Sequence, residues 1–302
     1  MIFRRKLYND MLRWKNERKG TTALLIKGAR RVGKSTLAEE FAKNEYKTYI
    51  LIDFAHISPK MSALFDDMSN LNFFFMHLQL ETGVTLYERE SVIIFDEVQL
   101  QPKARQAIKY LVKDGRYDYI ETGSLLSIKK NVQGIVIPSE ETRVTLQPMD
   151  FEEFYWAIGN TTSYGVLKQF YEQHHALNNS HRKVMRDLRL YMLVGGMPQA
   201  VDTYLSTNNL QAVDEKKREI IDLYKDDFNK IDPTGRASQL FATIPAQLNS
   251  NAGRYKISSV LENQDAQRVA EVVADMADSM TISLAYHAND PNVGLPMTKN
   301  LY

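Results

Sequence analysis

The stretch that decides the fold is GARRVGKS, residues 28–35, which matches the pattern G-x-x-x-x-G-K-[ST] with no mismatch. Glycines in this pattern let the backbone wrap around a phosphate, and amide N–H groups at the start of the next helix supply positive potential. An apolar run at residues 23–26 precedes the loop and a helical pattern at residues 35–44 follows it, which is the context such a loop needs. The sequence therefore predicts a nucleotide-phosphate loop. An ordinary glycine turn before a helix is the alternative.

The predicted loop supplies the residues expected to bind ATP. These are Gly28, Ala29, Arg30, Arg31, Val32, Gly33, Lys34, Ser35 and Thr36. Lys34 has the length to reach the β- and γ-phosphates, and the hydroxyl of Ser35 can hold Mg²⁺.

A second motif, SVIIFDEVQ at residues 91–99, places two acids after a run of apolar residues. A buried strand that ends in an acid delivers that acid to the crevice at the carboxyl edge of a parallel sheet. We predict that Asp96 holds Mg²⁺ together with Ser35, and that Glu97 is the general base that takes a proton from the attacking water. Taken without the loop, the same pattern is also typical of a solvated strand end.

Two weaker signals follow in the expected order. The predicted strand at residues 117–121 runs into Thr122, Gly123 and Ser124, and we predict that Ser124 senses the γ-phosphate or orients water. Arg143, before another predicted strand, could act as an arginine finger on the phosphate of a neighbouring subunit in a homo-oligomer. For Ser124 the alternative is a capped turn. For Arg143 it is an ordinary solvated arginine.

The order of elements predicts an α/β fold in which a parallel sheet forms the core. Strands are expected at residues 23–26, 48–53, 92–95, 117–121 and 143–146, with helices at 35–44, 71–80 and 102–113 between them. From Phe151 onward helical periodicity takes over, at residues 151–158, 166–175, 181–194 and 210–228.

The last 70 residues predict a winged-helix-like unit. Helical patterns at 239–248 and 265–280 flank a short element at 257–261, and two β-like runs at 281–286 and 296–302 form a candidate hairpin. The predicted domains are therefore an ATPase core with an N-terminal helix (1–148), a helical lid or linker (149–232) and the winged-helix-like unit (233–302).

Composition narrows the class of protein further. The 302 residues carry 38 Lys plus Arg against 37 Asp plus Glu, so no global charge favours nucleic acid. Cysteine is absent, which excludes disulfide frameworks and thiol catalysis. No apolar run reaches the roughly 18 residues of a membrane span and the N-terminus does not look like a secretory signal, so we expect a cytoplasmic protein with no membrane partner.

Taken together, GARRVGKS, FDEVQ, ETGS, Arg143 with LQPMDFEEF, GGMPQAV and LYKDD resemble a family of uncharacterised bacterial and archaeal AAA-type ATPases. In that family a P-loop core precedes a C-terminal domain of unknown function. The resemblance implies an AAA-like core, a helical lid, a winged helix and then a nuclease-like fold. Because the chain stops at Tyr302, where the last element is expected to begin, we expect a truncated C-terminal end and carry no nuclease activity over.

The expected function is Mg²⁺-dependent ATP hydrolysis, with Glu97 activating water and with hydrolysis moving the helical and winged-helix domains. One alternative is a nucleotide-dependent switch or adaptor with little turnover, whose winged helix docks a protein. A second alternative is ATP-dependent DNA binding. Against the DNA alternative, the helix predicted at 265–280 has one basic residue, Arg268, where a DNA-reading helix usually carries several.

Overall fold

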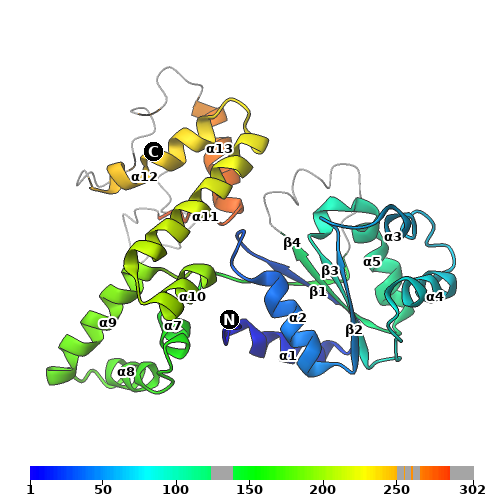
Figure 1. The fold of residues 1–302 in the computed structure, drawn as a ribbon, viewed down its shortest axis with the longest axis horizontal. Coiled ribbons are helices and arrows are strands. Elements are labelled where there is room, and N and C mark those ends of the chain that lie inside the picture. The colour runs from blue at the N-terminus through cyan, green and yellow to red at the C-terminus, as the bar shows by residue number, and fades with distance from the viewer. Residues whose placement is uncertain (124–138, 250–254, 256–259, 261–265, 286–302) are drawn as a thin grey trace, which may run out of the picture. The chain divides into compact units, whose positions relative to one another are not determined.

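The fold is built on one parallel sheet (Figure 1). The computed structural model describes residues 1–123, 139–249, 255, 260 and 266–285. Its strands lie in the order β2-β3-β4-β1-β5, and all neighbouring pairs are parallel. The strands are β1 (Ala23–Lys27), β2 (Thr48–Asp53), β3 (Ser91–Asp96), β4 (Asp118–Gly123) and β5 (Glu141–Thr145). The predicted α/β class is confirmed, and the predicted strands differ only at their ends.

Helices cover both faces of this sheet. Figure 1 shows α1 (Leu7–Arg18) and α2 (Lys34–Glu45) on one side and α3 (Pro59–Ala63), α4 (Leu71–Thr82) and α5 (Pro102–Asp114) on the other. A short 3-10 helix, η1 (Val98–Leu100), links β3 to α5. On the α4 and α5 side, Leu25, Ile93 and Phe95 are buried in one apolar cluster with residues of both helices. This cluster fixes the sheet against α4 and α5 and holds the carboxyl ends of the strands in place.

Five helices follow the sheet, and all but the last six residues of the fifth belong to the same compact unit, residues 1–225. They are α7 (Phe151–Ala157), α8 (Ser163–Glu172), α9 (His181–Val194), α10 (Pro198–Thr207) and α11 (Leu210–Ile231), with a 3-10 turn η2 (Asn178–Ser180) before α9. Asp150 starts α7 through a capping box with Glu153. Met149, Phe154, Val194 and Val201 belong to a second buried cluster, so these helices have a core of their own. The predicted helical region is confirmed.

The second compact unit, residues 226–302, contains α12 (Arg236–Asn249) and α13 (Ala266–Asp278). The strand predicted over 281–286 is wrong for residues 281–285, which form a bend and irregular chain. The hydroxyls of Ser279 and Thr281 both donate to the carbonyl oxygen of Met276, so this stretch closes the end of α13 instead of starting a strand. The second predicted strand, 296–302, and all of the element predicted at 257–261 except residue 260 lie outside the described residues. The winged helix and the boundaries at 148 and 232 stay predictions.

In the part of the chain that the structure describes, no helix is long and apolar enough to cross a bilayer.

Three charged side chains are buried together between α5 and the sheet. Nη1 of Arg105 lies 3.5 Å from Oε2 of Glu121, and its Nη2 lies 3.0 Å from Oε1 of Glu141. One guanidinium therefore faces two carboxylates away from water, where an excess negative charge is costly. Burial, together with the charge of Glu141, raises the pKa of Glu121 to about 8. This shift favours the protonated form of Glu121 near neutral pH.

This cluster makes stability depend on pH. The folded state binds the Glu121 proton more tightly than the unfolded chain does, since the unfolded pKa is about 4.3. The resulting stabilisation is full below about pH 4 and is lost as the pH rises toward 8. Relative to Glu121→Gln, we expect the unfolding free energy of the wild type to fall over this range by at most ~1.4 kcal/mol per pH unit in urea titrations. Substitution of the exposed Glu17 by Gln should leave the wild-type profile unchanged. Parallel profiles for wild type and Glu121→Gln would contradict the assignment.

Candidate functional site

The loop between β1 and α2 is curled by two residues in the left-handed region. Arg31 has a φ of 66° and Gly33 a φ of 92°. A side chain at Gly33 would strain this backbone, and Arg31 adopts it although it is not a glycine. Successive N–H groups in such a turn form a concavity that binds anions, and the free N–H groups of the first turn of α2 adjoin it. The backbone N–H groups of residues 28–35 can therefore bind the phosphate groups of a nucleotide.

Gly28 fixes the loop against the sheet. A Cβ at Gly28 would lie 2.4 Å from the carbonyl oxygen of Leu146, which follows β5. Leu146 is itself held, because its N–H donates to the carbonyl oxygen of Lys27 at 2.7 Å. Only glycine lets the first residue of the loop approach β5 this closely.

The ammonium group of Lys34 is turned into the loop. Lys34 is 5% exposed, and its Nζ donates to the carbonyl oxygens of Gly28 at 3.2 Å and Ala29 at 3.0 Å. Burial lowers its pKa, while the negative charges of Glu97 and Asp96 oppose that shift. The two acids thus lie close enough to Lys34 to act on its charge, and the three predicted site residues are brought together.

Asp96 joins the ends of β3 and β4 to the first turn of α2 through one carboxylate oxygen. Its Oδ1 accepts a hydrogen bond from Ser35 Oγ at 2.7 Å and another from the hydroxyl of Thr122. The strand order explains this meeting, because β4 lies between β1 and β3 and all three run parallel. Their carboxyl ends therefore share one edge of the sheet, where open α/β sheets bind ligands.

The same oxygen atoms fit a magnesium ion. Carboxylate and hydroxyl oxygens are ligands that Mg²⁺ accepts, and it usually completes its shell with water and phosphate oxygens. Ser35 and Asp96 supply two such oxygens beside the phosphate loop. Within the described residues, no three or more His, Cys, Asp or Glu side chains lie together as a metal-binding group, so Ser35 and Asp96 would depend on water and phosphate oxygens for the other ligands.

Glu97 has an unusual backbone and a restrained side chain. Its φ of 52° lies in the left-handed region, which non-glycine residues adopt at some energetic cost and often at functional sites. Its N–H donates to Thr122 Oγ1 at 3.3 Å, and its Oε2 accepts a hydrogen bond from the side-chain amide of Gln99. Gln99 is buried, so the Glu97 carboxylate has one fixed partner.

The remaining predicted residues are placed differently. Ser124, the predicted sensor, lies outside the described residues. Arg143 lies on the edge strand β5, in register with Leu25 of β1, and its half-exposed side chain pairs with Glu141 at 3.2 Å. Thr36 is exposed at the start of α2. The structure therefore gives Arg143 a partner within its own chain.

Thr122 and Gln99 are the contacts that sequence reasoning missed. Thr122 belongs to the same polar ETGS stretch as Ser124, but only the register of β4 beside β3 shows that its hydroxyl reaches Asp96. Gln99 follows Glu97 by two residues, and its role depends on the turn into η1. The position of Thr122 at the end of a predicted strand was a sequence signal that could have found its contact. The sequence offers no such signal for Gln99.

Comparison with known proteins agrees with this geometry. Residues 20–155 match a family described as an AAA domain, and residues 185–300 match a family described only as a domain of unknown function. The sheet and the phosphate loop thus have the fold of a P-loop NTPase with an AAA-like core. The two matched regions are similarities, and each covers less than half of the chain. No curated protein sequence matches it.

A solved structure with a TM-score above 0.5 shares the fold. The Walker-type ATPase PABY2304 of Pyrococcus abyssi is similar with a TM-score of 0.54 at 15% identity, covering 92% of this chain and 90% of that chain. The RuvB branch migration motor of Thermotoga maritima gives a TM-score of 0.39 at 14% identity, covering 94% and 90%. AMPPCP-bound DnaA of Aquifex aeolicus gives 0.36 at 12% identity, covering 92% and 89%.

The contact at Gly28 predicts a large difference between two glycine substitutions. Gly28→Ala forces a methyl group against the Leu146 carbonyl, so we expect a loss of about 1–3 kcal/mol in unfolding free energy and weaker ATP binding. Gly165→Ala is the matched control, because this glycine lies within α8 and a Cβ there meets nothing within 4 Å. Because Gly165 lies in the first turn of α8, we expect Gly165→Ala to be neutral or to stabilise by at most about 0.5–1 kcal/mol. Equal effects of the two substitutions on urea denaturation would contradict the close approach.

Proposed function

We propose that the protein is a Mg²⁺-dependent ATPase whose site is formed by Lys34, Ser35, Asp96 and Glu97. The observation that carries the proposal is the Asp96 carboxylate, which is bonded to Ser35 of the phosphate loop and lies next to Glu97 in the chain. The AAA family match and the fold shared with a Walker-type ATPase support it.

Each residue of the site has a distinct role in this proposal. The loop N–H groups and Lys34 bind the β- and γ-phosphates. Ser35 and Asp96 hold Mg²⁺, which when bound neutralises charge on the phosphate oxygens. The Glu97 carboxylate accepts a proton from the water that attacks the γ-phosphorus, and ADP leaves as the bond to the β-phosphate oxygen breaks. Thr122 holds Asp96 and the backbone of Glu97 in register.

Two wider roles belong to the same proposal. Arg143 could reach the phosphate of a neighbouring copy as an arginine finger, and to do so it has to leave its pair with Glu141. The C-terminal unit would bind a protein or DNA partner that responds to the nucleotide. Measuring oligomeric state with and without ATP, and ATP turnover with and without duplex DNA, separates these roles.

Two substitutions test the chemistry. Lys34→Ala removes a charge that contacts phosphate, so we expect ATP binding to be lost. Glu97→Gln keeps the size of the side chain but accepts no proton, so we expect ATP binding to persist while phosphate release falls about 100-fold or more. Binding is followed by titration with a fluorescent ATP analogue, and turnover by released phosphate.

The outcome also distinguishes an enzyme from a nucleotide switch. Wild-type protein that binds ATP but releases no more phosphate than Glu97→Gln would overturn the hydrolase. If such a protein still changed its oligomeric state or partner binding with ATP, it would be the switch.

A further inference from the structure

Arg5 ties the phosphate loop to the helical part of the same compact unit. It lies just before α1 and is 6% exposed. Its Nη1 donates to the carbonyl oxygen of Val32 in the loop at 2.9 Å, and its Nε donates to Oε2 of Glu153 in α7 at 3.2 Å. Its Nη2 donates to the carbonyl oxygen of Gln147 in the segment between β5 and α7. One buried side chain therefore joins the loop, this segment and α7.

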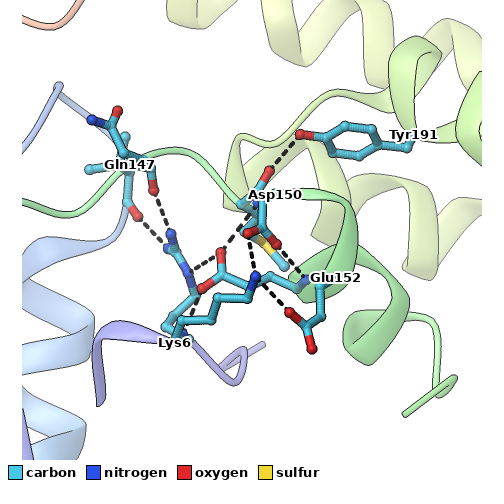
Figure 2. A network of polar contacts seen from close by, with 9 residues as sticks. Lys6, Gln147, Asp150, Glu152 and Tyr191 are labelled. Carbon is cyan, nitrogen blue, oxygen red and sulfur yellow. Dashed lines mark hydrogen bonds and ion pairs between the residues drawn. The ribbon is translucent and has the colours of Figure 1, made fainter. Parts of the chain in front are cut away.

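The partner of Arg5 on α7 is itself fixed. Glu153 Oε1 accepts from the N–H of Lys6 at 2.7 Å, and its Oε2 also accepts from the N–H of Asp150 at 3.3 Å. Lys6 Nζ bonds the carboxylates of Asp150 and Glu152, each at 2.6 Å (Figure 2). Because these bonds hold Glu153 at the start of α7, a displacement of α7 acts directly on Arg5.

The network continues into α9 and the GGMP stretch. The hydroxyl of Tyr191 in α9 donates a hydrogen bond to the carbonyl oxygen of Met149 at 2.9 Å (Figure 2). The N–H of Met149 donates to the carbonyl oxygen of Gly196 at 2.7 Å. A Cβ at Gly196 would lie 2.2 Å from the Met149 carbonyl oxygen, so this contact requires glycine. GGMP thus packs onto the segment that Arg5 holds.

A second side chain binds the loop from α11. The hydroxyl of Tyr224, in the LYKDD stretch, donates to the carbonyl oxygen of Arg30 at 2.7 Å. Pro198 of GGMP also lies beside the loop, 3.7 Å from the position of a Cβ on Gly33. GGMP and LYKDD have no role in the proposed nucleotide chemistry. Both nevertheless contact the phosphate loop.

These contacts determine the direction of loop N–H groups. In a planar trans peptide the C=O of one residue and the N–H of the next point in opposite directions. Arg5 holds the carbonyl of Val32 toward itself, so the N–H of Gly33 points away from Arg5. Tyr224 holds the carbonyl of Arg30 in the same way, so the N–H of Arg31 points away from Tyr224. Neither side chain needs to touch a phosphate to orient the donors that bind one.

We propose that Arg5 and Tyr224 are positioning residues that orient the phosphate-binding N–H groups and couple nucleotide binding to the docking of α7–α11 on the loop. Binding of phosphate and docking of the helices favour the same loop conformation. Each process therefore strengthens the other by the same free energy. The inference rests on the ATP-binding half of the proposed function and is independent of hydrolysis.

The test uses the full chain and a fluorescent ATP analogue with Mg²⁺. Arg5→Gln removes a charged donor, and we expect the Kd to rise about 10-fold or more. Tyr224→Phe removes one hydroxyl and keeps the ring, and we expect a rise of about 5-fold in both the Kd and the KM for ATP with little change in kcat.

The matched controls are two substitutions at exposed positions, Arg13→Gln and Tyr171→Phe. Both variants should bind the ATP analogue with the Kd of the wild type.

A second readout separates positioning from general stability. We expect ATP to increase hydrogen-exchange protection of residues 149–225 in the wild type and in Glu97→Gln, and to do so much less in Arg5→Gln and Tyr224→Phe. Loss of folded protein alone would lower the apparent kcat and leave the KM unchanged. If Arg5→Gln does not fold, Tyr224→Phe and Arg5→Lys give the same comparison.

The outcomes separate this inference from the function on which it rests. Wild-type protein that binds and hydrolyses ATP, with Arg5 and Tyr224 variants indistinguishable from their controls, overturns the inference and leaves the ATPase standing. Wild-type protein that does not bind the analogue overturns both. Normal binding and protection in Glu97→Gln without turnover overturns neither, because the inference concerns binding.

Discussion

The carboxylate of Asp96 is the interaction on which the rest of the site depends. A buried carboxylate is stable only when its oxygens are hydrogen-bonded, and Oδ1 obtains two donors, from Ser35 and Thr122. Both donors arrive only because β4 is inserted between β1 and β3 in a parallel sheet. The strand order that completes the fold therefore also supplies the hydrogen bonds of the acid that we propose holds Mg²⁺.

The phosphate loop is constrained on two sides by different parts of the chain. On the sheet side, Gly28 lies against Leu146, so the base of the loop cannot move without β5. On the helical side, side-chain donors hold the carbonyls of Arg30 and Val32. A loop whose carbonyls are bonded outward has its N–H groups oriented in advance, which lowers the reorganisation that phosphate binding would otherwise require. This double constraint gives GGMP and LYKDD a physical role beside the nucleotide chemistry.

Local patterns predicted the sheet and the loop because their signals are local. Apolar runs of four to six residues, a glycine-rich turn and a proline at the first turn of α5 each determine structure within a few residues. Thr122 could not be separated from Ser124 in this way, since only pairing across β3 and β4 decides which hydroxyl reaches Asp96. Arg5 is one of several basic residues near the N-terminus, and its partners follow it by 27 to 148 residues. The strand predicted at 281–286 failed at 281–285, where local hydroxyl bonds to Met276 close a helix.

The buried cluster beside α5 also constrains what Arg143 can do. Arg143 pairs with Glu141 from its exposed side while Arg105 pairs with the same carboxylate from inside, and the positive charges of both arginines lower the pKa of the neighbouring Glu121. If Arg143 left to meet a phosphate on another copy, Arg105 alone would face Glu121 and Glu141. A buried excess negative charge is costly, so the proton on Glu121 would be held more tightly. If Arg143 engages another subunit as proposed, that engagement would therefore be linked to proton binding by Glu121 in its own subunit.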